Sequence, residues 1–199
     1  MSAKKTNLTH LRELALTAIF SALIIVMTLV PYLGYITYGV IEITTLHIVV
    51  ILAAVCIGPK YGSVVGAVWG LSCLVRAYVA FPVFLSFGFG NFFVSVLPRI
   101  LVGTFAGLVF SALSKTKLNK IISAGISAVI GTLTNTVLVL SAMNLWLKFR
   151  GEEYSSFFDT FKNIFSTLIG LNGVIELSAA VILTMALYKA LEKPIKTLA

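Results

Sequence analysis

Long apolar segments dominate this chain, and short groups of polar residues, glycine and proline separate them. A helix needs about 20 predominantly apolar residues to cross a bilayer. Six segments approach or exceed that length, at 11–30, 41–57, 61–81, 93–113, 121–147 and 164–191. The pattern predicts an all-α membrane protein in which six transmembrane helices form one bundle, so residues 1–199 make a single domain.

Two of the six segments need comment. The first is long enough to span, and no small-residue cleavage pattern follows it, so we expect it to remain as the first helix and not to be a signal peptide. Glu42 and His47 interrupt the second segment, and its remaining apolar run is short for a span. We therefore consider that this helix begins within the loop that precedes it.

Composition and charge agree with a membrane location. Hydrophobic residues make up 59% of the chain and charged residues 11%, against about 25% charged in soluble domains. The formal net charge is +8, and the excess lies in alternate loops and at the termini. Because basic residues mark the inner side of a membrane protein, both termini are predicted to be cytoplasmic. The charge is then a topology signal, and we expect no nucleic-acid partner. The predicted inner basic residues are Lys4, Lys5, Arg12, Lys60, Lys115, Lys117, Lys120, Lys189, Lys193 and Lys196.

Motifs of catalysis and metal binding are not found in the sequence. It lacks the zinc-protease, serine-hydrolase and Walker A patterns, and its two cysteines both lie in apolar segments. We therefore expect a protein that is not an enzyme and that holds no metal ion or cofactor.

Glycines four residues apart occur in two of the predicted helices. Such spacing permits close approach of helices in lipid. The segment 61–81 carries Gly62, Gly66 and Gly70, and the segment 93–113 carries Gly103 and Gly107. We interpret both rows as packing surfaces within the bundle.

Polar side chains inside the predicted spans share one depth. Ionisable groups there cost about 2.5–3.5 kcal/mol each on insertion scales, so they indicate a functional site by default. The predicted orientation puts all of them in the outer half, while the inner half is nearly all hydrocarbon. This pattern predicts a cup that is open to the outside and sealed toward the cytoplasm. The candidate binding residues are His47, Arg76, Arg99, Asn135, Asn172 and Glu176.

The chemistry of these residues favours a small anionic ligand that also carries hydroxyl or amide groups. Arg99 suits a carboxylate, and Asn135 and Asn172 suit amides and hydroxyls. Structural roles are the alternative for each: Arg76 at the headgroups, His47 in a bond between helices, and Glu176 paired with an arginine. Phenylalanines and tyrosines of the outer loops suggest a lid, whereas Trp69 and Trp146 are expected to lie away from the centre of the cup.

Several transport mechanisms conflict with this pattern. A channel needs polar residues through the inner half, and a carrier with inverted repeats normally shows two matched halves. The sequence shows neither, which favours a receptor that captures a solute outside and depends on a partner to move it. A solitary facilitator that works without ATP, or a structural membrane protein, is the competing class.

Three short motifs within the six-helix pattern are those of a known family. They are Ile43-Thr-Thr-Leu-His47, Gly58-Pro-Lys-Tyr-Gly62 with Gly66 following, and Val96-Leu-Pro-Arg99 followed by Gly103. With them the chain resembles the S components, the substrate-binding subunits, of energy-coupling factor (ECF) vitamin transporters of bacteria, and the resemblance covers nearly the whole chain.

The resemblance implies a location, partners and a substrate class. S components lie in the bacterial cell membrane and bind a vitamin at the outer face. They then dock onto a transmembrane coupling protein and two cytoplasmic ATPases, through an Ala-xxx-Ala face that corresponds here to Ala18 and Ala22. The contexts of His47 and Arg99 look most like the pantothenate-type branch, and folate, riboflavin or another vitamin are the alternatives.

Overall fold

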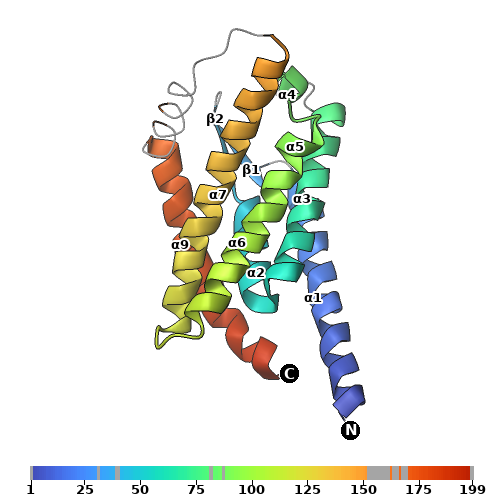
Figure 1. Cartoon of the computed structure of the whole chain (residues 1–199), viewed down its shortest axis with the longest axis vertical. Coiled ribbons are helices and arrows are strands. Elements are labelled where there is room, and N and C mark those ends of the chain that lie inside the picture. Colours follow the sequence, from blue (N-terminus) through green and yellow to red (C-terminus); the bar gives the residue numbers. More distant parts are fainter. Residues whose placement is uncertain are drawn as a thin grey trace.

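Long helices form the body of the protein, and the two strands with α4 and α5 gather away from its termini (Figure 1). The computed structural model describes residues 2–30, 32–38, 41–80, 83–86, 88–151, 162, 166 and 170–197. The long helices are α1 (Ser2–Leu29), α3 (Pro59–Val79), α6 (Leu97–Leu113), α7 (Lys120–Phe149) and α9 (Leu171–Thr197). The shorter elements are β1 (Tyr35–Tyr38), β2 (Ile41–Thr44), α2 (Leu46–Ile57), α4 (Val83–Ser86) and α5 (Phe92–Ser95).

Five helical segments of the described chain are long and apolar enough to cross a membrane. They are His10–Leu29, Pro59–Val79, Phe92–Leu113, Lys120–Phe149 and Gly173–Glu192. The helical class and the membrane character predicted from hydropathy are confirmed. The start of α1 and the end of α9 lie at the same end of the bundle (Figure 1). The first residues of the predicted sixth span lie outside the described part of the chain.

The prediction for the second span needs correction. Residues 41–44 form β2, which pairs antiparallel with β1, with Tyr35 opposite Thr44. Helix α2 begins only at Leu46 and has 12 residues, so at 1.5 Å per residue it is about 18 Å long. This is well short of the roughly 30 Å hydrocarbon core, and the start of the helix after a loop agrees with the alternative considered above.

Helix α2 is the centre of the bundle. It packs against α1, α3, α6, α7 and α9, and its side chains from Leu46 to Val55 are all buried. A helix that is buried on every side needs no polar face. Its continuous apolar sequence therefore looks like a span, although its surroundings are protein.

Local residues set the ends of several helices. Gly58 has φ 128°, a left-handed conformation that glycine adopts without strain, and it separates α2 from α3. Pro59 then opens α3, where its missing N–H costs no helical hydrogen bond. The Asn119 side chain accepts a hydrogen bond from the Ile121 N–H at 2.9 Å and caps α7.

Helices α3 and α6 touch through their backbones, as the glycine spacing predicts. A Cβ atom at Gly66 would overlap the carbonyl oxygen of Arg99, and one at Gly103 would overlap that of Gly62. Ser63 and Thr104 join the same interface with a hydroxyl–hydroxyl hydrogen bond of 2.8 Å. The close approach fixes the start of α6, and with it Arg99, against α3.

Gly66→Leu is therefore expected to destabilise the protein. Overpacked positions typically lower the free energy of unfolding by about 1–3 kcal/mol, and this substitution also pushes against the backbone of Arg99. Thermal unfolding in detergent measures the effect. Val64→Leu, on an exposed position of the same helix, is the control and should unfold at the wild-type temperature. Equal stability of Gly66→Leu would contradict the backbone contact.

Candidate functional site: a cavity between α3, α6, α7 and α9

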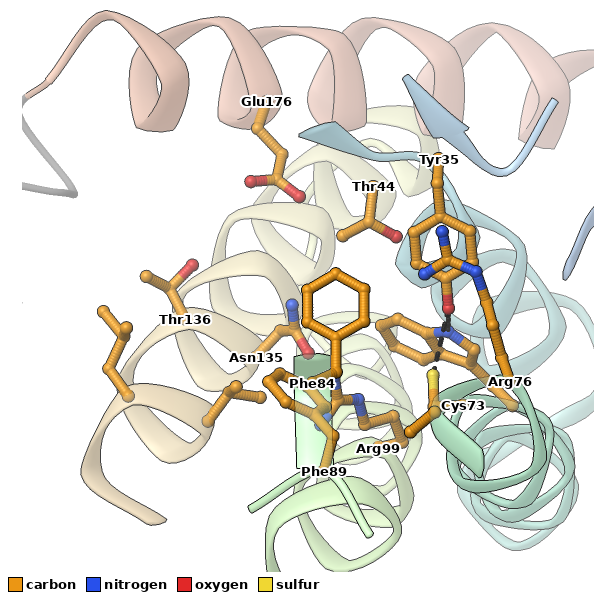
Figure 2. A pocket seen from close by; sticks show the side chains of 14 residues that line it. Tyr35, Thr44, Cys73, Arg76, Phe84, Phe89, Arg99, Asn135, Thr136 and Glu176 are labelled. Carbon is orange, nitrogen blue, oxygen red and sulfur yellow. Dashed lines mark hydrogen bonds between the residues drawn. The ribbon is translucent and has the colours of Figure 1, made fainter. Parts of the chain in front are cut away.

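A cavity of about 200 Å³ lies in the half of the bundle away from the two ends of the chain. Helices α3, α6, α7 and α9 supply its walls, and the hairpin and the α4–α5 segment supply the rest (Figure 2). Two guanidinium groups and one carboxylate line it. The lining residues are Tyr35, Thr44, Trp69, Cys73, Arg76, Ala77, Phe84, Phe89, Arg99, Asn135, Thr136, Val139, Leu140 and Glu176.

Helix α3 contributes one face of its C-terminal half to the cavity. Trp69, Cys73 and Arg76 follow at intervals of four and three residues, so they share a side of the helix. Trp69 is fully buried and donates its indole N–H to the Tyr35 hydroxyl at 3.3 Å. That hydroxyl lies 3.0 Å from the Cys73 sulfur. Burial raises the pKa of Tyr35 well above its ordinary value of 10.0, so the phenol stays neutral and joins β1 to α3.

Arg99 is the most enclosed charged side chain of the cavity. It is 5% exposed, and its guanidinium donates to the Val94 carbonyl at 2.6 Å. The same group lies 5.1 Å from the Trp69 ring and 5.6 Å from the Phe89 ring. Its Nε atom is buried and has no hydrogen-bond partner among the described residues. A buried donor of this kind costs about 1–3 kcal/mol when it stays unpaired, and an acceptor on a ligand could remove that cost.

Arg76 has a different environment. The central carbon of its guanidinium lies 3.9 Å from the centre of the Tyr35 ring and 5.7 Å from that of Phe84. Guanidinium groups stack well on aromatic faces. Arg76 therefore helps to shape the wall between the hairpin and α4 while it keeps a positive charge at the cavity.

Polar groups of α7 and α9 face the arginines. Asn135 is 8% exposed, and its Oδ1 atom has no partner in the described part of the chain. Glu176 comes from α9, and Figure 2 shows its carboxylate on the opposite side of the cavity from Arg99, with Asn135 between them. The three side chains thus form a row that begins with a cation and ends with an anion.

His47 lies next to Glu176, on the side away from the cavity. It is completely buried at the start of α2, and its Nδ1 atom lies 3.5 Å from Oε1 of Glu176. It does not line the cavity. The imidazole is placed to orient the Glu176 carboxylate, and a ligand in the cavity reaches that carboxylate first.

Aromatic side chains close the cavity near α4 and α5. Phe84 and Phe89 have ring centres 5.7 Å apart, and both line the cavity. The segment is held by its own hydrogen bonds: the Tyr78 hydroxyl donates to the Gly90 carbonyl at 3.3 Å, and the Ser95 hydroxyl donates to the Phe89 carbonyl at 2.5 Å. Because Arg99 holds the Val94 carbonyl in the same segment, the closing segment and the buried cation are linked.

Four of the six predicted binding residues line this cavity: Arg76, Arg99, Asn135 and Glu176. His47 lies one layer behind, and the side chain of Asn172 lies outside the described residues. The expectation for Trp69 was wrong, because its indole forms part of the cavity wall. Trp146 does not line the cavity and packs under Gly88.

Some lining residues escaped the sequence analysis. Cys73 was noted only as a cysteine in an apolar segment, and Thr44 was not among the candidate binding residues. A signal for Trp69 and Cys73 was present, since both share the helical face of Arg76. Thr44 belongs to the motif Ile43-Thr-Thr-Leu-His47, and its pairing with Tyr35 across the β1–β2 hairpin brings it to the cavity.

The arrangement suits the binding of a small polar ligand. In the part of the chain that the structure describes, no group of three or more His, Cys, Asp or Glu side chains is placed to hold a metal ion. A ligand that fits this cavity would bring an anionic acceptor to Arg99, a hydrogen-bond donor to the Asn135 Oδ1 atom and a donor to the Glu176 carboxylate.

Comparisons with known proteins identify similar chains over almost the full length. The family described as ECF transporter, substrate-specific component, matches residues 12–188. The pantothenate transporter PanT of Leuconostoc mesenteroides subsp. mesenteroides is 29% identical over 196 residues, which cover 94% of this chain and 93% of that protein. The pantothenic acid transporter PanT of Lactococcus lactis subsp. cremoris is 33% identical over 201 residues, covering 91% of this chain and 94% of that protein.

Proposed function

The chain belongs to the family of substrate-specific components of ECF transporters, and from this membership we propose that its cavity binds pantothenate for ATP-driven import. Members of the family are non-catalytic transporter subunits in the bacterial cell membrane. The names of the two relatives support pantothenate as the substrate. The observation that carries the proposal is the pair of buried atoms at the cavity, Arg99 Nε and Asn135 Oδ1, that have no hydrogen-bond partner among the described residues, with the Glu176 carboxylate lining the same cavity.

Pantothenate has a carboxylate at one end, an amide in the middle and two hydroxyls toward the other end. We propose that the carboxylate pairs with Arg99, whose Nε donor has no partner among the described residues. The guanidinium is held in place by the Val94 carbonyl and by the rings of Trp69 and Phe89. A charge-assisted hydrogen bond in such an enclosed site is stronger than a neutral one.

The other end of the ligand would then reach α7 and α9. The amide N–H is a donor for the Asn135 Oδ1 atom, and the hydroxyls are donors for the Glu176 carboxylate. This order of groups along the ligand follows the order of the side chains in Figure 2. His47 is a positioning residue for Glu176 in this proposal, and Asn172 stays a candidate contact from the same helix.

Purified protein in detergent is expected to bind pantothenate with saturation in isothermal titration calorimetry, and to bind riboflavin and folate far more weakly. Riboflavin offers no anion to Arg99, although Trp69 gives the cavity an aromatic wall on which a flat ring could stack. Folate has the anion but needs room for a pterin. Saturable binding of either vitamin in place of pantothenate would overturn the substrate assignment and leave the family unchanged.

Cys73 provides a direct report on occupancy. Its thiol lines the cavity, so bound pantothenate should shield it from a small thiol reagent. In a Cys56→Ser background, ligand at ten times its dissociation constant is expected to slow modification about tenfold by mass action. Cys56 does not line the cavity. The matched control, Cys73→Ser with Cys56 retained, should react at a rate that is independent of the ligand.

Import requires partner proteins, and membership of the family implies which ones they are. We propose that the loaded protein docks onto a transmembrane coupling protein that works with two cytoplasmic ATPases, and that Ala18 and Ala22 form the docking face. Both side chains are exposed on α1. Exposure supports this role over internal packing, because a residue that packs within the bundle would be covered.

A further inference from the structure

A second and larger hollow lies on the lipid-facing side of the bundle, between α1 and α3. It is a groove of about 930 Å³. Ile25 and Leu29 form one side, and Leu71, Val75 and Val79 form the other. These five side chains are between 44% and 78% exposed, so the groove is open along its length. We call it the α1–α3 groove.

Its interior offers no unpaired polar group among the side chains that line it. The hydroxyls of Thr28 and Ser72, which line it, are satisfied by their own helices: Thr28 donates to the Ile24 carbonyl at 2.8 Å, and Ser72 donates to the Val68 carbonyl at 2.8 Å. The ligand cavity, in contrast, holds Arg99 Nε and Asn135 Oδ1, which have no hydrogen-bond partner among the described residues. The part of the groove between the aliphatic side chains therefore suits an apolar chain.

The dimensions of the groove match one leaflet of a membrane. Along α3 it extends from Val68 to Ala80, which is about 18 Å at 1.5 Å per residue. Half of the hydrocarbon core is roughly 15 Å. Both bordering helices are long and apolar enough to span, so the open side faces acyl chains and not water.

A cation lies toward one end of the groove. Arg76 lines it two turns of helix beyond Val68, which places the guanidinium near the level where lipid phosphates begin. Tyr32, which is 75% exposed, borders the same end. Arginine recognises phosphate well, and an aromatic residue with a polar tip is typical of the membrane interface. The charge thus fits a phospholipid headgroup above an acyl chain.

We propose that the α1–α3 groove is a binding site for one membrane phospholipid, with an acyl chain between α1 and α3 and its phosphate directed toward Arg76. The lipid is a structural part of the protein, and it differs from the surrounding bilayer in that it stays bound when bulk lipid is removed.

The position of the groove gives this lipid a functional consequence. Tyr35 and Arg76 line both the groove and the ligand cavity, and they stack on each other at 3.9 Å. The acyl chain therefore packs behind the wall that the ligand meets in front. An empty groove removes van der Waals contacts from that wall, so loss of the lipid should weaken ligand binding. This second step depends on the proposed function, whereas lipid binding itself does not.

Native mass spectrometry of the full chain, after size exclusion in lipid-free detergent, tests the site. The wild type is expected to retain one phospholipid. Val75→Trp and Val79→Trp each fill the groove with a side chain and should reduce retention at least about tenfold, since the apolar contact area is then occupied. Val174→Trp, an exposed position on α9 outside the groove, should retain lipid like the wild type. Equal retention by all four proteins would overturn the proposal, as would a wild-type dimer that the groove variants dissociate.

Calorimetry with pantothenate then tests the coupling between groove and cavity. Removal of lipid should raise the dissociation constant of the wild type and of Val174→Trp by about tenfold, and added phosphatidylglycerol should restore it. Val75→Trp should change less than about twofold, because its indole replaces the acyl chain. Lipid-independent affinity of the wild type would refute the coupling. If no variant binds pantothenate even with lipid present, the proposed function fails, and the retention measurement still decides the groove.

Discussion

Arg99→Gln is expected to weaken pantothenate binding by about thirtyfold or more. Removing one member of a buried, hydrogen-bonded charge pair costs about 2–5 kcal/mol, and about 1.4 kcal/mol corresponds to a tenfold change in the dissociation constant. The loss should be near the upper end, since Arg99 is 5% exposed and the glutamine leaves the ligand carboxylate without a counter-charge. Isothermal titration calorimetry measures the change.

A comparison of pantothenol with pantothenate separates the effect of the lost Arg99 charge from any structural effect of Arg99→Gln. Pantothenol is the alcohol analogue of pantothenate, in which a hydroxymethyl group replaces the carboxylate. The wild type should bind it much more weakly than pantothenate, and Arg99→Gln should bind the two compounds with similar affinity. Arg99 also holds the Val94 carbonyl. If the substitution weakened both compounds by the same factor, Arg99 would act by holding the α5 segment and not by binding the carboxylate.

Ala18→Trp and Ala22→Trp are expected to abolish ATP-dependent uptake while the dissociation constant for pantothenate stays within about twofold of wild type. Both alanines are exposed, and they are one helical turn apart on the same side of α1. An indole there requires no repacking of the bundle, but it prevents close approach of a partner helix, which small residues permit in membranes. Uptake is measured in vesicles that contain the coupling protein and both ATPases.

The control for this experiment is Ile182→Trp. This position on α9 is 66% exposed and lies away from α1 in the sequence and the bundle, so uptake should remain at the wild-type level. Vesicles without the coupling module should show no uptake by any of the proteins. Uptake in such vesicles would identify a facilitator, and lost pantothenate binding in the alanine variants would assign Ala18 and Ala22 to internal packing.

Hydropathy predicted the long helices well and failed at α2. A span and a buried central helix both lack a polar face, and periodicity cannot separate them. The 12 residues of α2 are too few to cross the bilayer, yet the apolar residues of β2 extend the run at the sequence level. Only the pairing of β2 with β1 shows that the run contains two elements.

The candidate site was predicted in part for a similar reason. Ionisable residues in spans are costly, so Arg76, Arg99 and Glu176 were visible as exceptions to an apolar pattern. Trp69 and Cys73 are ordinary residues of a membrane helix, and their role became visible only when the side chains around Arg99 and Tyr35 were seen together. His47 was visible in the sequence as an ionisable residue in an apolar segment. Its position next to Glu176, on the side away from the cavity, depends on how α2 packs against α9.

The sequence by itself determined that this chain spans a membrane, which helices are long and that α3 and α6 each carry a row of glycines for close packing, because these properties follow from local composition and from spacing along a helix. The sequence also identified Arg99 as a candidate cation of the site, because a charged residue within a span is costly and therefore indicates a function. The tertiary structure alone decided the order of Arg99, Asn135 and Glu176 across the cavity. It alone decided that one wall, made by Tyr35 and Arg76, separates the cavity from the groove. These relations join residues from distant segments, and they depend on helix rotation and crossing, which no local pattern specifies.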